Sequence, residues 1–125
     1  MKGIEEYKKN SHQVATNEQL VLRAFEKAIT LMWTAHEKLE DDDRSGSVQD
    51  LHHTRSIISE LLSCLDHDEG GELTAHLHQL YVFILRELSA AGFEGDVSRL
   101  ENAIAVSEQL YEGFFEAFTP KEVCE

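Results

Sequence analysis

The sequence contains very little proline and no pattern typical of strands. Its single proline, Pro120, lies close to the C-terminus of the 125-residue chain. Proline breaks helix interiors, and no proline occurs in residues 1–119 to interrupt a helix there. No segment alternates apolar and polar residues for long enough to indicate a strand. Both absences predict an all-α protein.

Basic residues are also scarce. There are 11 Lys and Arg residues against 24 Asp and Glu, which gives a formal net charge of -13. A phosphate backbone or an anionic membrane surface would repel such a chain. No apolar run approaches the ~20 residues that cross a bilayer, and "MKGIEEYKKN" lacks the apolar part of a secretory signal. We therefore expect no nucleic-acid partner, no membrane insertion and a cytoplasmic location.

The chain has only two cysteines, Cys64 and Cys124. They form neither a metal-binding pair nor a disulfide framework, as is typical of a reducing compartment. The hydrophobic share is 42%, and a chain of this length buries a single core. We expect one domain over residues 1–125.

Apolar residues at spacings of three and four predict four amphipathic helices. Their expected bounds are about 17–40, 47–66, 72–91 and 96–118, after a short helix over 3–10 and before a tail over 119–125. Thr16 and Gln19 suit a capping box for the first long helix, Ser47 and Asp96 suit caps for the second and fourth, and Gly92 suits a stop for the third. Such helices pack most simply as an antiparallel four-helix bundle. The expected core comprises Val21, Phe25, Ala28, Met32, Ala35, Leu39, Leu51, Ile58, Leu61, Leu62, Leu65, Leu73, Leu77, Leu80, Tyr81, Ile84, Leu88, Leu100, Ile104, Leu110, Tyr111, Phe114 and Phe118.

The stretch "LDHDEGGEL" separates the second and third of these helices. Gly70 and Gly71 can adopt backbone angles that other residues avoid, which lets the chain reverse. Glu69 and Glu72 suit the positive N-terminal end of the next helix. We expect Gly70 and Gly71 to form a structural turn.

The seven histidines do not form a recognisable metal motif. A di-iron bundle needs two E-x-x-H motifs, and the nearest approach is D-x-x-H from Asp50 to His53. His76 and His78 project about 200° apart on a helix, so they do not share a face. Nucleophile elbows and phosphate-binding glycine loops are also missing. We expect no catalytic residue, no cofactor and no metal.

The first long helix carries more apolar residues than one buried stripe requires. Leu22, Ile29 and Trp33 flank the core stripe on one side, and Leu20, Ala24 and Leu31 flank it on the other. One interpretation is that this helix touches neighbours on both sides within the bundle. The other is an apolar groove for helices of another protein.

The chain resembles one family, the flagellar secretion chaperone FliS. The stretch "YKKNSHQVATNEQLVL" matches the N-terminal pattern of that family, and "IISELLSCLDHDEGGELTAHLHQLYVFILREL" matches its leucine-aspartate and double-glycine-glutamate segment. "GDVSRLENAI" is similar to the start of its last helix. The matching residues are Tyr7, Asn10, Glu18, Leu20, Leu22, Leu65, Asp66, Gly70, Gly71, Glu72, Leu80, Tyr81 and Asp96.

The resemblance implies a helical bundle that holds the disordered C-terminal segment of flagellin before export and prevents its premature polymerisation. It also implies that the N-terminal segment, with Tyr7 and Asn10 at its centre, covers part of the groove when cargo is absent. A component of the flagellar export gate is a further implied partner. The candidate flagellin-binding residues are Tyr7, Asn10, Val14, Leu20, Leu22, Ala24, Ile29 and Trp33.

Two other functional classes compete with this hypothesis. A metal-binding bundle enzyme would contain stoichiometric iron or zinc. A self-assembling helical protein, or a bundle that binds a cargo other than flagellin, would differ in its oligomers or its ligand. The chaperone hypothesis predicts a monomer or weak dimer that forms a one-to-one complex with cargo.

Overall fold

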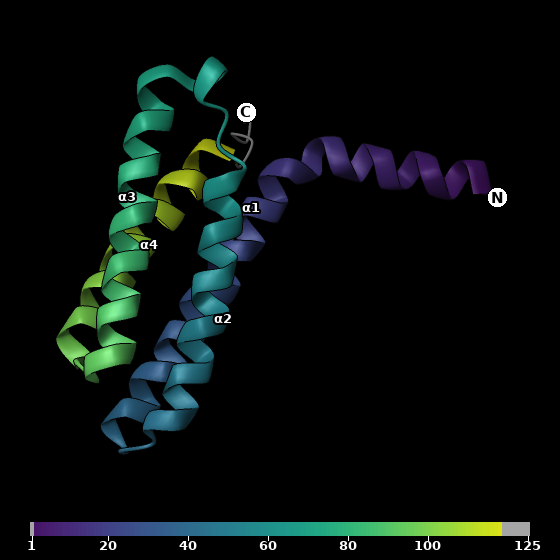
Figure 1. Ribbon diagram of the computed structural model, residues 1–125. Helices are drawn as coiled ribbons and strands as arrows, with labels where there is room; N and C mark the ends of the chain where they lie inside the picture. The colour runs from purple at the N-terminus through teal and green to yellow at the C-terminus, as the bar shows by residue number, and fades with distance from the viewer. Residues whose placement is uncertain (1, 119–125) are drawn as a thin grey trace.

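Over residues 2–118, four helices joined by three short turns make up the fold of the computed structural model (Figure 1). It describes the backbone of residues 2–118 and the side chains of residues 18–118 except 67 and 69. The helices are α1 (Lys2–Glu40), α2 (Arg44–Ser63), α3 (His67–Glu94) and α4 (Val97–Phe118), and no strand occurs within residues 2–118. Each helix packs against its neighbours in sequence, and α4 also packs against α1. The predicted all-α, antiparallel four-helix bundle is confirmed.

α1 is a single helix of 39 residues. The prediction of a separate helix over 3–10, followed by a new start near Asn17, is therefore wrong. No proline or glycine lies between Gly3 and Glu40, and residues that suit a cap, such as Thr16 and Gln19, can also occupy a helix interior at small cost. Figure 1 shows the first turns of α1 extending away from the other helices.

Two adjacent aspartates build the turn between α1 and α2. Asp42 has a φ of 65°, and the Asp43 N–H donates to the Lys38 carbonyl at 2.7 Å, which is the Schellman arrangement for ending a helix. The Asp43 carboxylate then accepts from the Gly46 N–H at 3.0 Å and caps α2. The prediction that Ser47 caps this helix is therefore wrong. Aspartate caps a helix as well as serine does, and Asp43 starts the helix earlier in the chain. Ser47 is instead buried inside the first turns, where its hydroxyl donates to the Arg44 carbonyl.

The second turn begins earlier than the sequence indicated. α2 ends at Ser63 rather than at Asp66, and the Asp66 carboxylate accepts from the Asp68 N–H at 3.1 Å, so Asp66 belongs to the start of the next helical turn. α3 is then interrupted at Gly71, whose φ of 59° and ψ of -134° lie outside the helical region. At Gly70, an added Cβ would lie 1.4 Å from the Thr74 hydroxyl oxygen. Torsion therefore requires glycine at position 71, and space requires it at position 70.

The third turn lies at the same end of the bundle as the first. α3 continues through Gly92 and ends at Glu94. Gly95 follows with a φ of 67°, and its N–H donates to the Ala91 carbonyl at 2.7 Å. The predicted stop at Gly92 is wrong because the positive φ is required three residues later. Asp96 caps α4 as predicted, accepting from the Ser98 hydroxyl and N–H. These hydrogen bonds, chiefly that of the hydroxyl, hold the pKa of Asp96 below its usual value.

The core lies along the axis of the bundle, and Phe25 is its first fully buried residue on α1 among the described residues. The Phe25 ring contacts Tyr81 of α3 and Phe114 of α4, with ring centroids 5.9 and 5.5 Å apart. The buried apolar residues are Phe25, Ala28, Met32, Ala35, Leu51, Ile58, Tyr81, Ile84, Leu88, Ala91, Leu100, Ala103 and Ile104.

Two predicted core residues of α3 are exposed instead. Leu73 and Leu80 are 67% and 37% accessible. Each precedes a buried residue, Thr74 and Tyr81 respectively, so each is rotated about 100° from the core stripe. The leucine repeat alone did not reveal which of the two neighbouring faces is buried.

Glu87 of α3 is a buried acidic residue with two polar partners on α4. The Glu87 carboxylate of α3 is almost fully buried, and it accepts from Arg99 at 2.7 Å and from Asn102 at 3.1 Å, both on α4. Burying a carboxylate without such partners would be costly. The three side chains therefore fix α3 and α4 in register.

We expect Gly71→Ala to destabilise the protein by about 1 to 3 kcal/mol, because it places a Cβ on a backbone conformation essentially restricted to glycine. No atom lies within 4 Å of that Cβ, so the cost is torsional. Gly113→Ala is the matched control: its Cβ also meets no atom within 4 Å, and its position inside α4 should gain about 0.5 to 1 kcal/mol. Urea unfolding of both variants measures the difference. Equal stabilities would contradict the assigned torsion.

A second prediction concerns Tyr81. Burial, with a smaller contribution from Cys64, raises its pKa to about 12. The ordinary value is 10, so the neutral phenol stabilises the fold fully below pH 10, and this stability is lost as the pH rises through 12. We expect the thermal midpoint of the protein to fall across that interval and Tyr81→Phe to reduce the fall. Tyrosinate absorbance, followed in parallel, should show Tyr81 and Tyr111 titrating late, because the pKa of each phenol is raised, and Tyr81→Phe should remove one of the two late titrations. A normal titration of all tyrosines would contradict the prediction.

Candidate functional site

A groove runs between α1 and α2 on the outside of the bundle. It encloses about 820 Å³ and is open to solvent. Its apolar residues are Leu20, Val21 and Ala24 from α1 and Ile57, Leu61 and Cys64 from α2. Leu20 is 53% accessible, so apolar surface is available there. An apolar groove of this form suits the apolar face of an amphipathic helix.

The rim of the groove is charged. Arg23 and Lys27 come from α1, and His53 and Glu60 come from α2. Within the described part of the chain, no hydrogen bond or ion pair involves Arg23 or Lys27. Two adjacent cations therefore line one side of the groove in a chain whose net charge is -13.

The opposite side of α1 faces α4, and three polar contacts hold it there. Tyr111 donates to the Glu26 carboxylate at 2.6 Å, and the Trp33 indole donates to Glu108 at 2.9 Å. One turn further along, the His36 ring nitrogen lies 2.9 Å from Glu101. The hydrogen bond to Glu26 is the main cause that raises the pKa of the Tyr111 phenol.

The candidate residues of the first long helix fall on both of these sides. Leu20 and Ala24 line the groove with α2. Trp33 lies on the α4 side, and Ile29, four residues before it, packs partly buried against the core. Leu22 is partly buried and lies four residues before Glu26, on the same side of the helix. The structure therefore does not bring the five candidate residues with described side chains into one surface.

Tyr7, Asn10 and Val14 lie in the N-terminal half of α1, and their side chains are outside the described residues. The covering of the groove by this segment stays a prediction from the resemblance. The backbone in Figure 1 runs away from the bundle there instead of across it.

Sequence reasoning missed the contribution of α2 to the groove. Ile57, Leu61 and Cys64 recur at spacings of four and three, the same signal that marked the stripe on α1. We assigned the leucines of this helix only to the core. The stripe formed by Ile57, Leu61 and Cys64 shows that α2 also has an apolar flank beside its core-facing residues.

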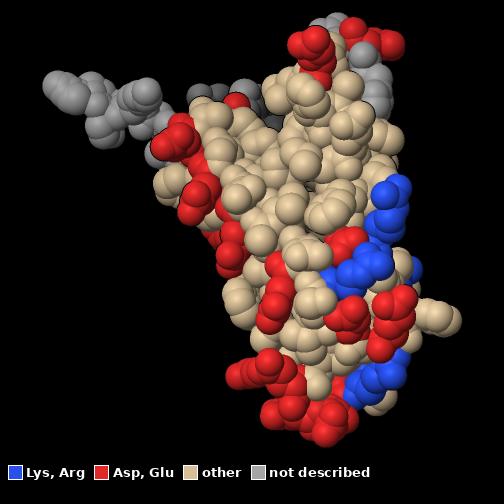
Figure 2. All heavy atoms as spheres, turned by 90° about the vertical axis from the view of Figure 1, so that its left-hand side faces the viewer, with Lys and Arg blue, Asp and Glu red and all other residues tan. Residues whose placement is uncertain are grey.

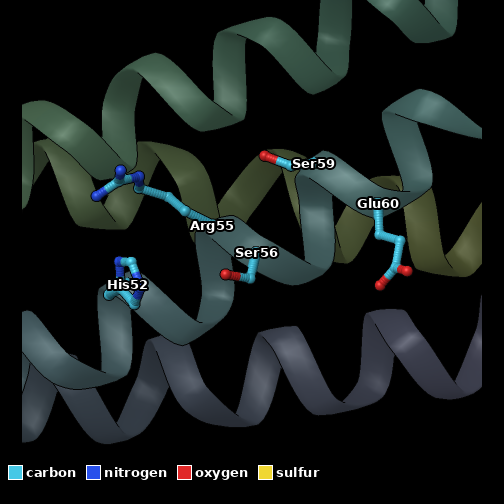
Figure 3. Close-up of a pocket in the computed structure, with 5 residues that line it drawn as sticks. All are labelled: His52, Arg55, Ser56, Ser59 and Glu60. Atoms are coloured by element: carbon cyan, nitrogen blue, oxygen red, sulfur yellow. The ribbon is translucent and has the colours of Figure 1, made fainter.

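The outward face of α2 carries a separate, polar hollow. Figure 3 shows its five lining residues, all from this helix: His52, Arg55, Ser56, Ser59 and Glu60. Nucleophilic chemistry requires a base within hydrogen-bonding distance of the hydroxyl. Among the described residues, no hydrogen bond joins His52 to either serine. This set therefore lacks the contact that would activate a serine.

The described residues provide neither a metal site nor a membrane span. No group of three His, Cys, Asp or Glu side chains in the described part could hold a metal ion. None of the described helices has both the length and the apolar character needed to cross a membrane. Figure 2 shows many acidic and few basic side chains on the side of the bundle that faces left in Figure 1. That surface does not favour a polyanion.

Comparison with known proteins identifies the family. The model of a family described as flagellar protein FliS matches residues 1–121. A flagellar secretion chaperone FliS of Campylobacter jejuni is 25% identical over 119 residues, which cover 95% of this chain and 93% of that relative. The Escherichia coli K12 protein of the same name is 28% identical over 104 residues, 82% of this chain and 76% of the relative. The match spans nearly the whole chain and confirms the resemblance found in its motifs, so this chain belongs to the FliS family.

Proposed function

We propose that this protein is a flagellar secretion chaperone that binds the disordered C-terminal segment of flagellin in the cytoplasm. The observation that carries the proposal is the family match over residues 1–121. By covering the segment, the chaperone prevents premature polymerisation and keeps flagellin in a form that can be exported. Its action is binding and release, without catalysis. A component of the export gate is a further partner in the proposal.

The groove between α1 and α2 is the proposed place where the flagellin segment begins to bind. Leu20 and Ala24 on α1 face Ile57 and Leu61 on α2, and together they offer a channel in which an amphipathic helix can bury apolar side chains. Arg23 and Lys27 beside them would pair with carboxylates of the cargo. Because the cargo orders as it binds, part of the contact energy is offset by lost entropy, which keeps the complex releasable.

The α4 side of α1 is the weaker candidate for the same role. To enter between α1 and α4, a cargo helix would have to replace the contacts of Glu26 with Tyr111 and of Trp33 with Glu108. Among the described residues, no hydrogen bond or ion pair joins the α1 and α2 residues that line the groove, and Leu20 there is half exposed. The ion pair between Lys38 of α1 and Asp50 of α2 involves neither of the two walls of the groove. We therefore assign Leu20 and Ala24 to direct contact with cargo. Leu22, Ile29 and Trp33 would contact cargo only if it also wraps around α1 to the side that faces α4.

The third prediction tests the groove by calorimetric titration of a C-terminal flagellin peptide. Leu20→Gln should raise the dissociation constant by about tenfold or more, because a buried anchor contributes at least ~1.4 kcal/mol. It should change folding stability by only about 0.5 kcal/mol, since the side chain is half exposed. Leu73→Gln is the matched control, because Leu73 is 67% exposed and does not line the groove. Equal effects of the two variants on binding would exclude the groove.

The same titration, repeated at several temperatures and two salt concentrations, tests the mode of binding. Coupled folding onto an apolar groove should give a negative heat-capacity change and a gain of helix in the cargo. Affinity should fall little with added salt if apolar burial dominates. A heat-capacity change near zero with steep weakening by salt would contradict the apolar groove.

Trp33 reports which side of α1 is covered. It is the only tryptophan, it is 46% accessible, and it lies on the α4 side. Cargo confined to the groove should leave its emission nearly unchanged, whereas a blue shift on binding indicates that cargo also covers the α4 side.

The fourth prediction concerns the N-terminal part of α1. Removal of residues 1–15 should leave the bundle folded, because the apolar stripe that the sequence predicts for α1 starts after Thr16. Its fully buried members among the described residues are Phe25, Ala28, Met32 and Ala35. Circular dichroism should lose only the signal of the removed turns. If Tyr7, Asn10 and Val14 compete with cargo or contact it, the truncated protein will bind the flagellin peptide with a changed affinity. An unchanged affinity would remove this segment from the site.

A further inference from the structure

A second apolar hollow lies between α2 and α3, on the side of α2 that faces away from the groove. It encloses about 670 Å³, and its lining residues are Val48, Leu51, Arg55, Leu88, Ser89, Ala90, Gly92 and Phe93. His53 of the groove and Arg55 of this hollow are two residues apart and so project about 200° apart around α2. The two surfaces are thus separate, and cargo in the groove would leave this hollow open.

Phe93 stands at the edge of this hollow as an exposed knob. Its side chain is 85% accessible, and that of Val48 on the facing helix is 42% accessible. The backbone under the knob is fixed: the Arg44 guanidinium donates to the carbonyls of Gly92 and Phe93, and Gly95 ends the helix two residues later. A knob held in this way loses little conformational freedom on binding, which favours its use as an anchor.

Arg55 supplies an unmatched positive charge on the same surface. It lines both this hollow and the polar hollow beside it, and Figure 3 shows its side chain directed toward α3 and away from Ser56, Ser59 and Glu60. Within the described residues, no hydrogen bond or ion pair involves its guanidinium, although the side chain is partly buried. None of the residues lining the apolar hollow is acidic. The exposed acid next to the knob is Glu94.

We propose that this surface binds a second copy of the chain. Two copies related by a two-fold axis would each insert Phe93 into the hollow of the other and place Glu94 beside the other's Arg55. A two-fold interface requires one surface to carry both members of every contact. This surface meets the requirement, because it carries both Phe93 and the hollow that would receive it, and both Glu94 and Arg55.

The resulting dimer is weak. Each copy carries a net charge of -13, so the two copies repel each other over most of their surfaces. The hollow is also lined by only eight residues, fewer than the roughly 20 to 30 residues that each partner contributes to a stable interface. Dimerisation at this surface leaves both α1/α2 grooves free, so a dimer could hold two cargo segments.

Sedimentation equilibrium of the full chain, from about 10 μM to about 1 mM, tests the proposal. The unmodified protein should pass from monomer to dimer within this range. Phe93→Gln should raise the dimer dissociation constant at least tenfold, as expected for a central anchor. Arg55→Glu and Glu94→Arg should each weaken the dimer several-fold, and the protein carrying both changes should recover most of the loss, because the pair is restored with its charges exchanged.

Leu73→Gln, which removes an exposed leucine elsewhere on α3, should leave the dimer unchanged. Helical circular dichroism checks that every variant is folded, and titration with the flagellin peptide should give the same affinity for Phe93→Gln as for the unmodified chain. A monomer throughout the concentration range would overturn the proposal. So would a dimer that is insensitive to Phe93→Gln, or a double variant no stronger than the single ones.

Discussion

The burial of one stripe on α1 is the constraint on which the rest of the structure depends. Phe25, Ala28, Met32 and Ala35 are completely buried, and large and small residues alternate along the stripe so that the neighbouring helices can approach closely. Once this stripe points inward, the two flanks of α1 can face only α2 and α4. The apolar residues of α1 outside the buried stripe therefore lie on two separate sides of the helix: one lines the groove with α2, and the other faces α4.

The two flanks of α1 differ in how they are closed. On the α4 flank, carboxylates of Glu26, Glu101 and Glu108 meet polar groups of the opposite helix at 2.6 to 2.9 Å. On the α2 flank, apolar side chains line an open groove. An apolar groove can exchange solvent for a ligand without breaking any protein hydrogen bond, and this makes it the better entry point for a segment that must later leave.

Sequence alone predicted the helices well because their signals are local. The spacings of three and four placed Phe25, Ile84 and Leu100 inside, and the Asp96 cap depends only on a neighbouring serine. The misassigned boundaries depended on choices between similar residues. Asp43 and Ser47 can both cap a helix, and Gly92 and Gly95 can both end one, so the decision comes from the packing of the turns, where Arg44 reaches across to α3.

The site was less predictable than the fold because it is formed by pairing. Leu20 and Ala24 were named from the excess of apolar residues on one helix, but their partners on α2 depend on which face of that helix meets α1. A periodicity gives the faces of a helix without saying which neighbour each face meets. Trp33 illustrates the limit: it belongs to the apolar surplus of α1, yet its indole binds Glu108 on the other side.

The pair of glycines before the regular part of α3 also bears on how such a chain can change over evolutionary time. Gly70 is restricted by the side chain of Thr74, whereas Gly71 is restricted by its own backbone torsion with no atom nearby. A restriction imposed by a neighbour can be lifted when that neighbour changes, so position 70 can drift together with position 74. A restriction imposed by torsion has no such partner. Position 71 therefore stays glycine for as long as the chain keeps this turn.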